Sequence, residues 1–117
     1  MQKALVAFDS EILNTILKKM LEDLGFEVTC TSSADQLTKI CAQEEPCVVF
    51  FDLTLEGQDT LMLASAFLGK KPVLIVVSAN ADPNTMKQAL QNGANEYIMK
   101  PFDNDILQSK LSIVGLL

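Results

Sequence analysis

Short runs of apolar residues alternate with amphipathic segments along this chain. Four of the runs contain three to five consecutive apolar residues, and they cover positions 4–8, 47–51, 73–77 and 97–99. An apolar run of this kind, rich in Val, Ile and Phe, is typical of a strand that is buried on both faces of a parallel sheet. One polar residue follows each run, and in chain order these residues are Asp9, Asp52, Ser78 and Lys100.

The segments between the first runs predict two helices and one further strand. Apolar residues recur at helical spacing over positions 12–24, and Gly25 predicts the end of this helix. Residues 26–30 alternate between apolar and polar side chains, as in a strand with one less buried face. The sequence Ser-Ala-Asp-Gln at 33–36 has the form of a capping box, and it predicts a second helix that ends before Pro46.

The second half of the chain predicts three more helices. Residues 53–58 are expected to form a loop, followed by a helix over about 60–68 that is capped by Asp59 or Thr60. Gly69-Lys70-Lys71-Pro72 predicts a turn into the next strand. The boundaries of the last two helices are indicated by Asp82-Pro83, Asn92-Gly93 and Asp103.

Five strands that alternate with five helices predict one doubly wound α/β domain over residues 1–117. The short connections require parallel strands and right-handed crossovers. Periodicity does not give the order of the strands, although the buried runs before Asp52 and Ser78 favour central positions for the first, third and fourth strands.

Composition narrows the classes of partner. The net charge is −6, and an acidic surface is poorly suited to nucleic acid, so protein or small-anion partners are expected. Charged residues interrupt every apolar stretch, so we expect no membrane-spanning segment. The chain has no histidine, which excludes a Cys/His zinc site, and its three cysteines are interpreted as buried thiols of a cytoplasmic protein: Cys30, Cys41 and Cys47.

The four polar residues are expected to meet, because ligands bind beyond the carboxyl ends of parallel strands. Two adjacent carboxylates, Asp9 and Asp52, would repel each other unless a cation such as Mg²⁺ lay between them. The backbone carbonyl of Thr54 would add a third ligand. Asp52 would then be a nucleophile toward phosphorus, with Lys100 and Ser78 contacting phosphoryl oxygens.

Each residue also has a local interpretation. Asp9 would cap the first helix, Ser78 would satisfy nearby backbone groups, and Lys100 would be an ordinary surface charge. The separations between the four residues fit whole numbers of strand–helix units. This spacing favours one shared site.

These motifs resemble those of response-regulator receiver domains, the CheY-like family. The resemblance covers essentially the whole chain and rests on Phe8-Asp9, Phe51-Asp52, Val77-Ser78-Ala79 and Tyr97-Ile98-Met99-Lys100-Pro101-Phe102. It implies a flavodoxin-like three-layer α/β/α sandwich with strand order 2-1-3-4-5.

The resemblance also implies a role for each site residue. Asp52 would accept a phosphoryl group from the phosphohistidine of a sensor histidine kinase or phosphotransfer protein, or from a small phosphodonor. Asp9, Asp52 and the Thr54 carbonyl would bind Mg²⁺, and Lys100 would contact the phosphoryl group. Ser78 would be the switch hydroxyl, whose movement lets Tyr97 rotate and changes the face made by the last helices.

Such a domain would be a signalling switch and not an enzyme beyond its own phosphorylation and dephosphorylation. Without histidine it must receive the phosphoryl group from another molecule. It would control a partner protein or an attached output domain, without binding nucleic acid or membrane directly. A monomer or a weak homodimer is expected.

The chain departs from the family pattern at several positions. Phe8 replaces the first of two acids that usually end the first strand, which predicts weakened Mg²⁺ affinity. Glu56 stands where proline is common, and its charge would either compensate for Phe8 or disfavour the phosphoryl group. Thr60 stands where glycine usually follows the acid, here Asp59.

Three alternative functions follow from these departures and from the site itself. A degenerate pseudo-receiver would bind proteins without phosphorylation, and Phe8 favours it. A phosphohydrolase of the haloacid-dehalogenase type needs an acid two residues after the nucleophile, where this chain has Thr54. A nucleotide or flavin carrier needs a phosphate-binding turn, which Asp9-Ser10-Glu11 does not provide.

Overall fold

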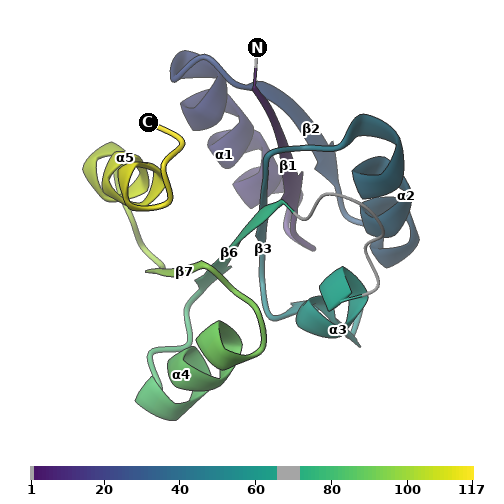
Figure 1. Cartoon of the computed structure of the whole chain (residues 1–117), viewed down its shortest axis with the longest axis vertical. Helices are drawn as coiled ribbons and strands as arrows, with labels where there is room; N and C mark the ends of the chain where they lie inside the picture. The colour runs from purple at the N-terminus through teal and green to yellow at the C-terminus, as the bar shows by residue number, and fades with distance from the viewer. Residues whose placement is uncertain (1, 66–71) are drawn as a thin grey trace.

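A five-stranded parallel sheet forms the centre of the molecule, with strand order β2-β1-β3-β6-β7 (Figure 1). The computed structural model describes residues 2–65 and 72–117. The strands of this sheet are β1 (Lys3–Ala7), β2 (Glu27–Thr31), β3 (Val48–Phe51), β6 (Val73–Ser78) and β7 (Glu96–Met99). This order is the predicted 2-1-3-4-5 order of a flavodoxin-like sheet, which is therefore confirmed.

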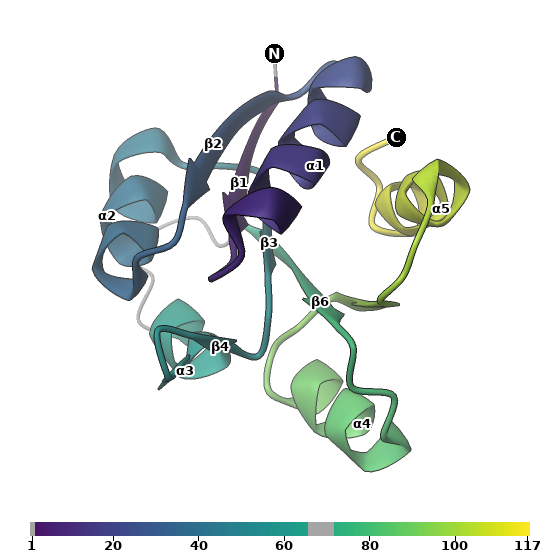
Figure 2. The same cartoon turned by 180° about the vertical axis from the view of Figure 1, so that it is seen from behind.

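Helices cover both faces of the sheet and complete the three layers (Figures 1 and 2). They are α1 (Glu11–Asp23), α2 (Ala34–Glu44), α3 (Thr60–Ser65), α4 (Pro83–Gln91) and α5 (Asn104–Ile113). Alternate residues of each strand point to opposite faces. Thus Phe50 of β3 packs in one core layer with residues of α1 and α5, and Phe51 packs in the other with residues of α2, α3 and α4.

The helix starts agree with the local sequence signals. Ser33, Asp82 and Asp103 are the N-caps of α2, α4 and α5, and each side chain accepts a hydrogen bond from the first turn. The capping box of α2 is only half formed, because the Ser33 N–H donates to Thr31 Oγ1 instead of to Gln36. Asp59 Oδ1 accepts from the N–H groups of the first turn of α3, which settles which of the two predicted residues caps it.

One expectation for local structure was wrong, and one apolar pattern does not correspond to burial. The predicted loop at 53–58 contains an antiparallel hairpin, formed by β4 (Thr54–Leu55) and β5 (Gln58–Asp59). Ile12 and Ile16 share the helical spacing of α1, but they are 75% and 49% exposed. The sheet covers only the stripe of α1 that contains Leu17 and Leu21.

Other features of the chain fall partly outside the described residues. The predicted turn at 69–72 and the predicted end of the third helix near residue 68 both do so. Within the described part of the chain, no helix is long and apolar enough to cross a membrane.

Candidate functional site

The predicted site residues lie at the carboxyl edge of the sheet. Ala7, Phe51, Val76 and Tyr97 are neighbours in the pairing register, and they form one row across the four strands. Asp52 is one position beyond this row, Asp9 and Ser78 are two beyond, and Lys100 is three beyond. Because the strands are parallel, these positions all lie on the same side of the row.

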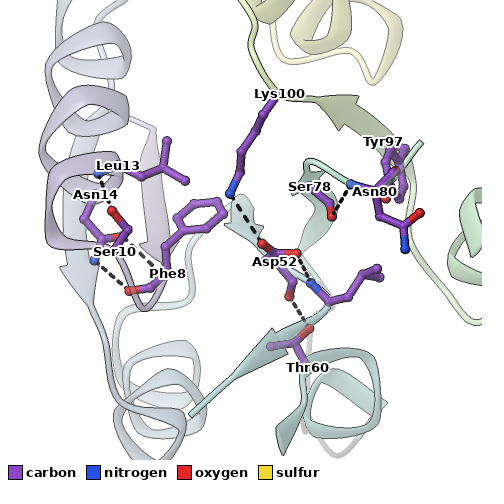
Figure 3. Close-up of polar contacts among 11 residues, drawn as sticks. Phe8, Ser10, Leu13, Asn14, Asp52, Thr60, Ser78, Asn80, Tyr97 and Lys100 are labelled. Atoms are coloured by element: carbon purple, nitrogen blue, oxygen red, sulfur yellow. Dashed lines mark hydrogen bonds and ion pairs between the residues drawn. The ribbon is translucent and has the colours of Figure 1, made fainter. Parts of the chain in front are cut away.

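Neighbouring groups hold both the side chain and the backbone of Asp52, and its carboxylate contacts the ammonium of Lys100 (Figure 3). Its Oδ1 accepts a 2.7 Å hydrogen bond from the Leu53 N–H, and its Oδ2 lies 3.4 Å from Lys100 Nζ. Its backbone carbonyl accepts a 2.5 Å hydrogen bond from Thr60 Oγ1, and Thr60 is fully buried. The Asp52 side chain remains 32% exposed, so a reactant can reach this carboxylate although hydrogen bonds hold the residue in place.

Lys100 extends from the end of β7 toward Asp52, and Figure 3 shows it passing the ring of Phe8. Its Nζ lies 5.6 Å from the centre of that ring, which is within the range of a cation–π interaction. Its backbone N–H donates a 2.9 Å hydrogen bond to the Ser78 carbonyl. The main chain of Lys100 is therefore anchored to β6, and its ammonium lies between an aromatic face and a carboxylate.

Asp9 contacts the hairpin that follows Asp52. Its Oδ1 accepts a 2.9 Å hydrogen bond from the backbone N–H of Glu56, which joins the end of β1 to the β4–β5 hairpin. The N-cap of α1 is Ser10, whose side chain accepts from the Leu13 N–H. Asp9 therefore does not cap this helix, and its carboxylate faces the loop that carries Thr54.

Glu56 makes a second contact that sequence reasoning missed. Its Oε1 accepts a 2.6 Å hydrogen bond from the Ala34 N–H at the start of α2. Glu56 and Gly57 both have positive φ, 51° and 75°, as expected in a two-residue hairpin turn. The carboxylate of Glu56 thus stabilises the positive N-terminal end of α2. This role differs from both expectations for Glu56, which were compensation for Phe8 and repulsion of the phosphoryl group.

Ser78 and Tyr97 both bind the backbone of Asn80 (Figure 3). Ser78 Oγ accepts a 3.1 Å hydrogen bond from the Asn80 N–H, and Tyr97 Oη donates a 2.8 Å hydrogen bond to the Asn80 carbonyl. Both side chains are buried, at 5% and 4% exposure. The ring of Tyr97 thus already occupies an interior position, and Asn80 is a connecting residue that the sequence did not single out.

Asn14 is a further residue that sequence reasoning missed. It is 5% exposed, and its Oδ1 accepts from the Phe8 N–H at 3.1 Å. Its Nδ2 donates to the carbonyls of Phe8 and Thr31, at 3.0 and 3.2 Å. A signal was present, since Asn14, Leu17 and Leu21 are spaced at i, i+3 and i+7 on the buried stripe of α1.

The chemistry of the donor set fits a hard divalent cation that keeps most of its water. Asp9 and Asp52 provide two carboxylates, and the hydrogen bonds that they accept leave further lone pairs available. In residues 2–65 and 72–117, no three acidic, cysteine or histidine side chains gather into a metal cluster. Mg²⁺ is suited to such a sparse site, because it binds through one or two carboxylates and retains several waters.

Comparison with known proteins identifies a family. The sequence model described as the response regulator receiver domain matches residues 4–112. The chain is 32% identical to the transcriptional regulatory protein KdpE of Staphylococcus aureus, over 96% of this chain and 49% of that protein. It is 30% identical to the transcriptional regulatory protein CrdR of Helicobacter pylori, over 94% of this chain and 53% of that protein. The chain thus spans about half the length of these curated relatives.

Solved structures share the fold. A response regulator of Burkholderia pseudomallei, solved with a phosphorylated aspartic acid, a calcium ion and citrate, is 26% identical with a TM-score of 0.84; the match covers 95% of this chain and 66% of that one. A receiver domain protein of Clostridium thermocellum has a TM-score of 0.85 at 22% identity, covering 97% of this chain and 93% of that one. The second likeness concerns the fold alone.

Proposed function

Because this chain belongs to the response regulator receiver domain family, we propose that it is a phosphoryl-accepting switch with Asp52 as the acceptor. Receiver domains are signalling domains of two-component systems rather than classical enzymes. The observation that carries the proposal is the contact between Lys100 Nζ and Asp52 Oδ2 at the carboxyl edge of the sheet. A carboxylate that is about one-third exposed and lies beside an ammonium suits attack on an anionic phosphoryl group.

The transfer step is a displacement at phosphorus. A carboxylate oxygen of Asp52 forms a bond to phosphorus, while the P–N bond of a phosphohistidine or the P–O bond of a small phosphodonor breaks. The leaving group keeps the electron pair of that bond. Lys100 neutralises charge on the phosphoryl oxygens, and Asp9 and Asp52 with the Thr54 carbonyl would hold Mg²⁺, which supplies further neutralisation when bound.

The response would reach the surface through Asn80. A phosphoryl oxygen that accepts a hydrogen bond from Ser78 Oγ draws that hydroxyl toward Asp52 and away from the Asn80 N–H that it now binds. The Asn80 carbonyl holds Tyr97 Oη, so a shift of this loop also changes the surroundings of the ring. The surface that changes would be the one formed by α4, β7 and α5.

Relatives support a place in a signalling chain. Receiver domains interact with histidine kinases or phosphotransfer proteins and with output domains. The relatives named transcriptional regulators are about twice as long as the matched region, which supports an output domain or a separate partner for this receiver. We place the domain in the cytoplasm, where a sensor kinase would present its phosphohistidine.

The experiment is incubation with acetyl phosphate and Mg²⁺, followed by intact-mass measurement. We expect a phosphoryl adduct on the wild type and on Asp35→Asn, an exposed acid in the first turn of α2, but not on Asp52→Asn. We also expect a change in the fluorescence of Tyr97 with beryllofluoride and Mg²⁺. Absence of both responses in the wild type, or an adduct that persists in Asp52→Asn, would overturn the proposal.

A further inference from the structure

The aromatic ring of Phe8 lies beside the proposed acceptor Asp52, and its contacts indicate a role beyond core packing. Phe8 is 1% exposed, and Asn14 binds both of its backbone polar groups. Two hydrogen bonds to a buried side chain thus fix the backbone of Phe8, and its ring is enclosed in the core. Lys100 Nζ lies over that ring at 5.6 Å.

The ion pair to Asp52 is a weak restraint on Lys100 by itself. The N···O separation of 3.4 Å is longer than the roughly 2.7–2.9 Å of a strong charge-assisted hydrogen bond. Both side chains are about one-third exposed, so solvent screens their attraction. A lysine side chain also loses much of its rotamer entropy when one geometry is imposed on it. A second contact is needed to keep the ammonium in place.

The ring supplies that second contact at low cost. The negative face of the ring attracts the ammonium. Because the backbone of Phe8 is already fixed, forming this contact requires little further ordering of Phe8. The other end of the contact is also anchored, because the Lys100 N–H donates to the Ser78 carbonyl. Only the side chain of Lys100 between these anchors remains to be ordered.

We propose that Phe8 is a positioning residue that holds the Lys100 ammonium at the Asp52 carboxylate through its aromatic face. The inference rests on the proposed function of Asp52, and it assigns to Phe8 a contribution to phosphoryl transfer that acts through Lys100. The ring does not touch the reacting atoms. It fixes a cation without adding negative charge next to an incoming anionic group.

The test changes the ring electrostatically and leaves its shape almost unaltered. Phe8 is replaced through an amber codon by 4-fluoro-, 3,5-difluoro- and 3,4,5-trifluorophenylalanine, which withdraw electron density from the face in steps. The same three replacements at Phe26, a 2%-exposed residue in the same core layer, are the matched control. Each Phe8 variant is also made in a Lys100→Met background.

Two quantities are measured for every variant. The first is the NMR shift of the Lys100 ε-methylene protons without phosphodonor, which senses the ring current of Phe8. The second is the rate constant for phosphorylation by acetyl phosphate at saturating Mg²⁺. We expect the Lys100 resonances to move stepwise toward those of an exposed lysine, and the rate to fall about two- to fivefold over the series. Neither change is expected at Phe26, and the rate is expected to be flat in Lys100→Met.

The possible outcomes separate the two proposals. Unchanged Lys100 resonances and rates across the Phe8 series overturn the positioning role, as does an equal fall in rate at Phe26 or in Lys100→Met. If the wild type accepts no phosphoryl group, the proposed function fails, and the Lys100 resonances alone decide whether Phe8 holds the ammonium.

Discussion

Asn14 is predicted to be the polar side chain whose loss most weakens the frame of the site. Replacing it by alanine removes the acceptor of the Phe8 N–H and the donor to the carbonyls of Phe8 and Thr31. These groups lie at the junction of β1, α1 and β2. In the described part of the chain, no buried side-chain polar atom lacks a partner, so the variant would introduce a defect that this fold otherwise avoids.

The size of the effect follows from burial. An unsatisfied buried donor or acceptor costs about 1–3 kcal/mol, and Phe8, with two such groups, is 1% exposed. Water that enters the space left by the amide would recover part of this. We expect a loss of about 2–4 kcal/mol from a total stability of roughly 5–15 kcal/mol. With an m-value of about 2 kcal/mol per molar urea, the midpoint falls by roughly 1–2 M.

Urea unfolding followed by far-UV circular dichroism measures this loss. Thr15→Ala is the matched control, because its hydroxyl donates only to the Glu11 carbonyl on the exposed side of the same helix, and a change within about 0.5 kcal/mol is expected. Asn14→Asp keeps the size but cannot donate to the carbonyls of Phe8 and Thr31, so it should destabilise at least as much as Asn14→Ala. A loss below about 1 kcal/mol for Asn14→Ala would refute the reasoning.

Three further predictions concern other parts of the domain. Burial raises the pKa of Cys41 to about 12, from 9.0. As the pH rises, the unfolded chain therefore releases the Cys41 proton before the folded protein does. The free energy of unfolding should be unaffected by this thiol below pH 9 and should fall between pH 9 and 12 by up to about 1.4 kcal/mol per pH unit. Urea titrations at a series of pH values should show a smaller fall for Cys41→Ala. Lys110 and Glu96 form a partly buried ion pair at 2.8 Å, so Lys110→Met should lower the free energy of unfolding by roughly 0.5–2 kcal/mol. The difference between wild type and Lys110→Met should be smaller in concentrated NaCl. Glu56→Ala should cost about 0.5–2 kcal/mol and speed hydrogen exchange of the Ala34 amide, whereas Glu56→Gln, which keeps an acceptor oxygen, should retain most of its protection.

The sequence predicted the sheet well because its signals are local and strong. Apolar runs such as 47–51 can only be buried on both faces, and a parallel sheet between two helical layers satisfies that condition. Caps such as Asp82 and Asp103 act within one turn of their own helix, so the sequence contains all of their geometry. The convergence at the sheet edge followed from parallel strands alone.

The features that were missed depend on contacts between distant segments. The strands β4 and β5 have two residues each, too few to show any periodicity. Glu56 stabilises α2 from another part of the chain, across a separation of 22 residues. The exposure of Ile12 was also hidden, since an apolar pattern does not reveal how much of a helix the sheet will cover.

The two sides of Asp52 differ in how firmly they are held, and this difference indicates which side can move. On the β1 side, the buried amide of Asn14 makes three hydrogen bonds of 3.2 Å or less. On the β6 side, Asn80 is joined to Ser78 and to Tyr97 by one hydrogen bond each.

A net hydrogen bond contributes about 0.5–1.5 kcal/mol, so the two Asn80 contacts together hold roughly 1–3 kcal/mol. A single charge-assisted hydrogen bond from Ser78 to a phosphoryl oxygen, at about 1.5–3 kcal/mol, would be enough to offset both. It would not offset the Asn14 contacts together with the burial of Phe8. A phosphoryl group on Asp52 is therefore expected to rearrange the loop between β6 and α4 while β1 and α1 stay in place.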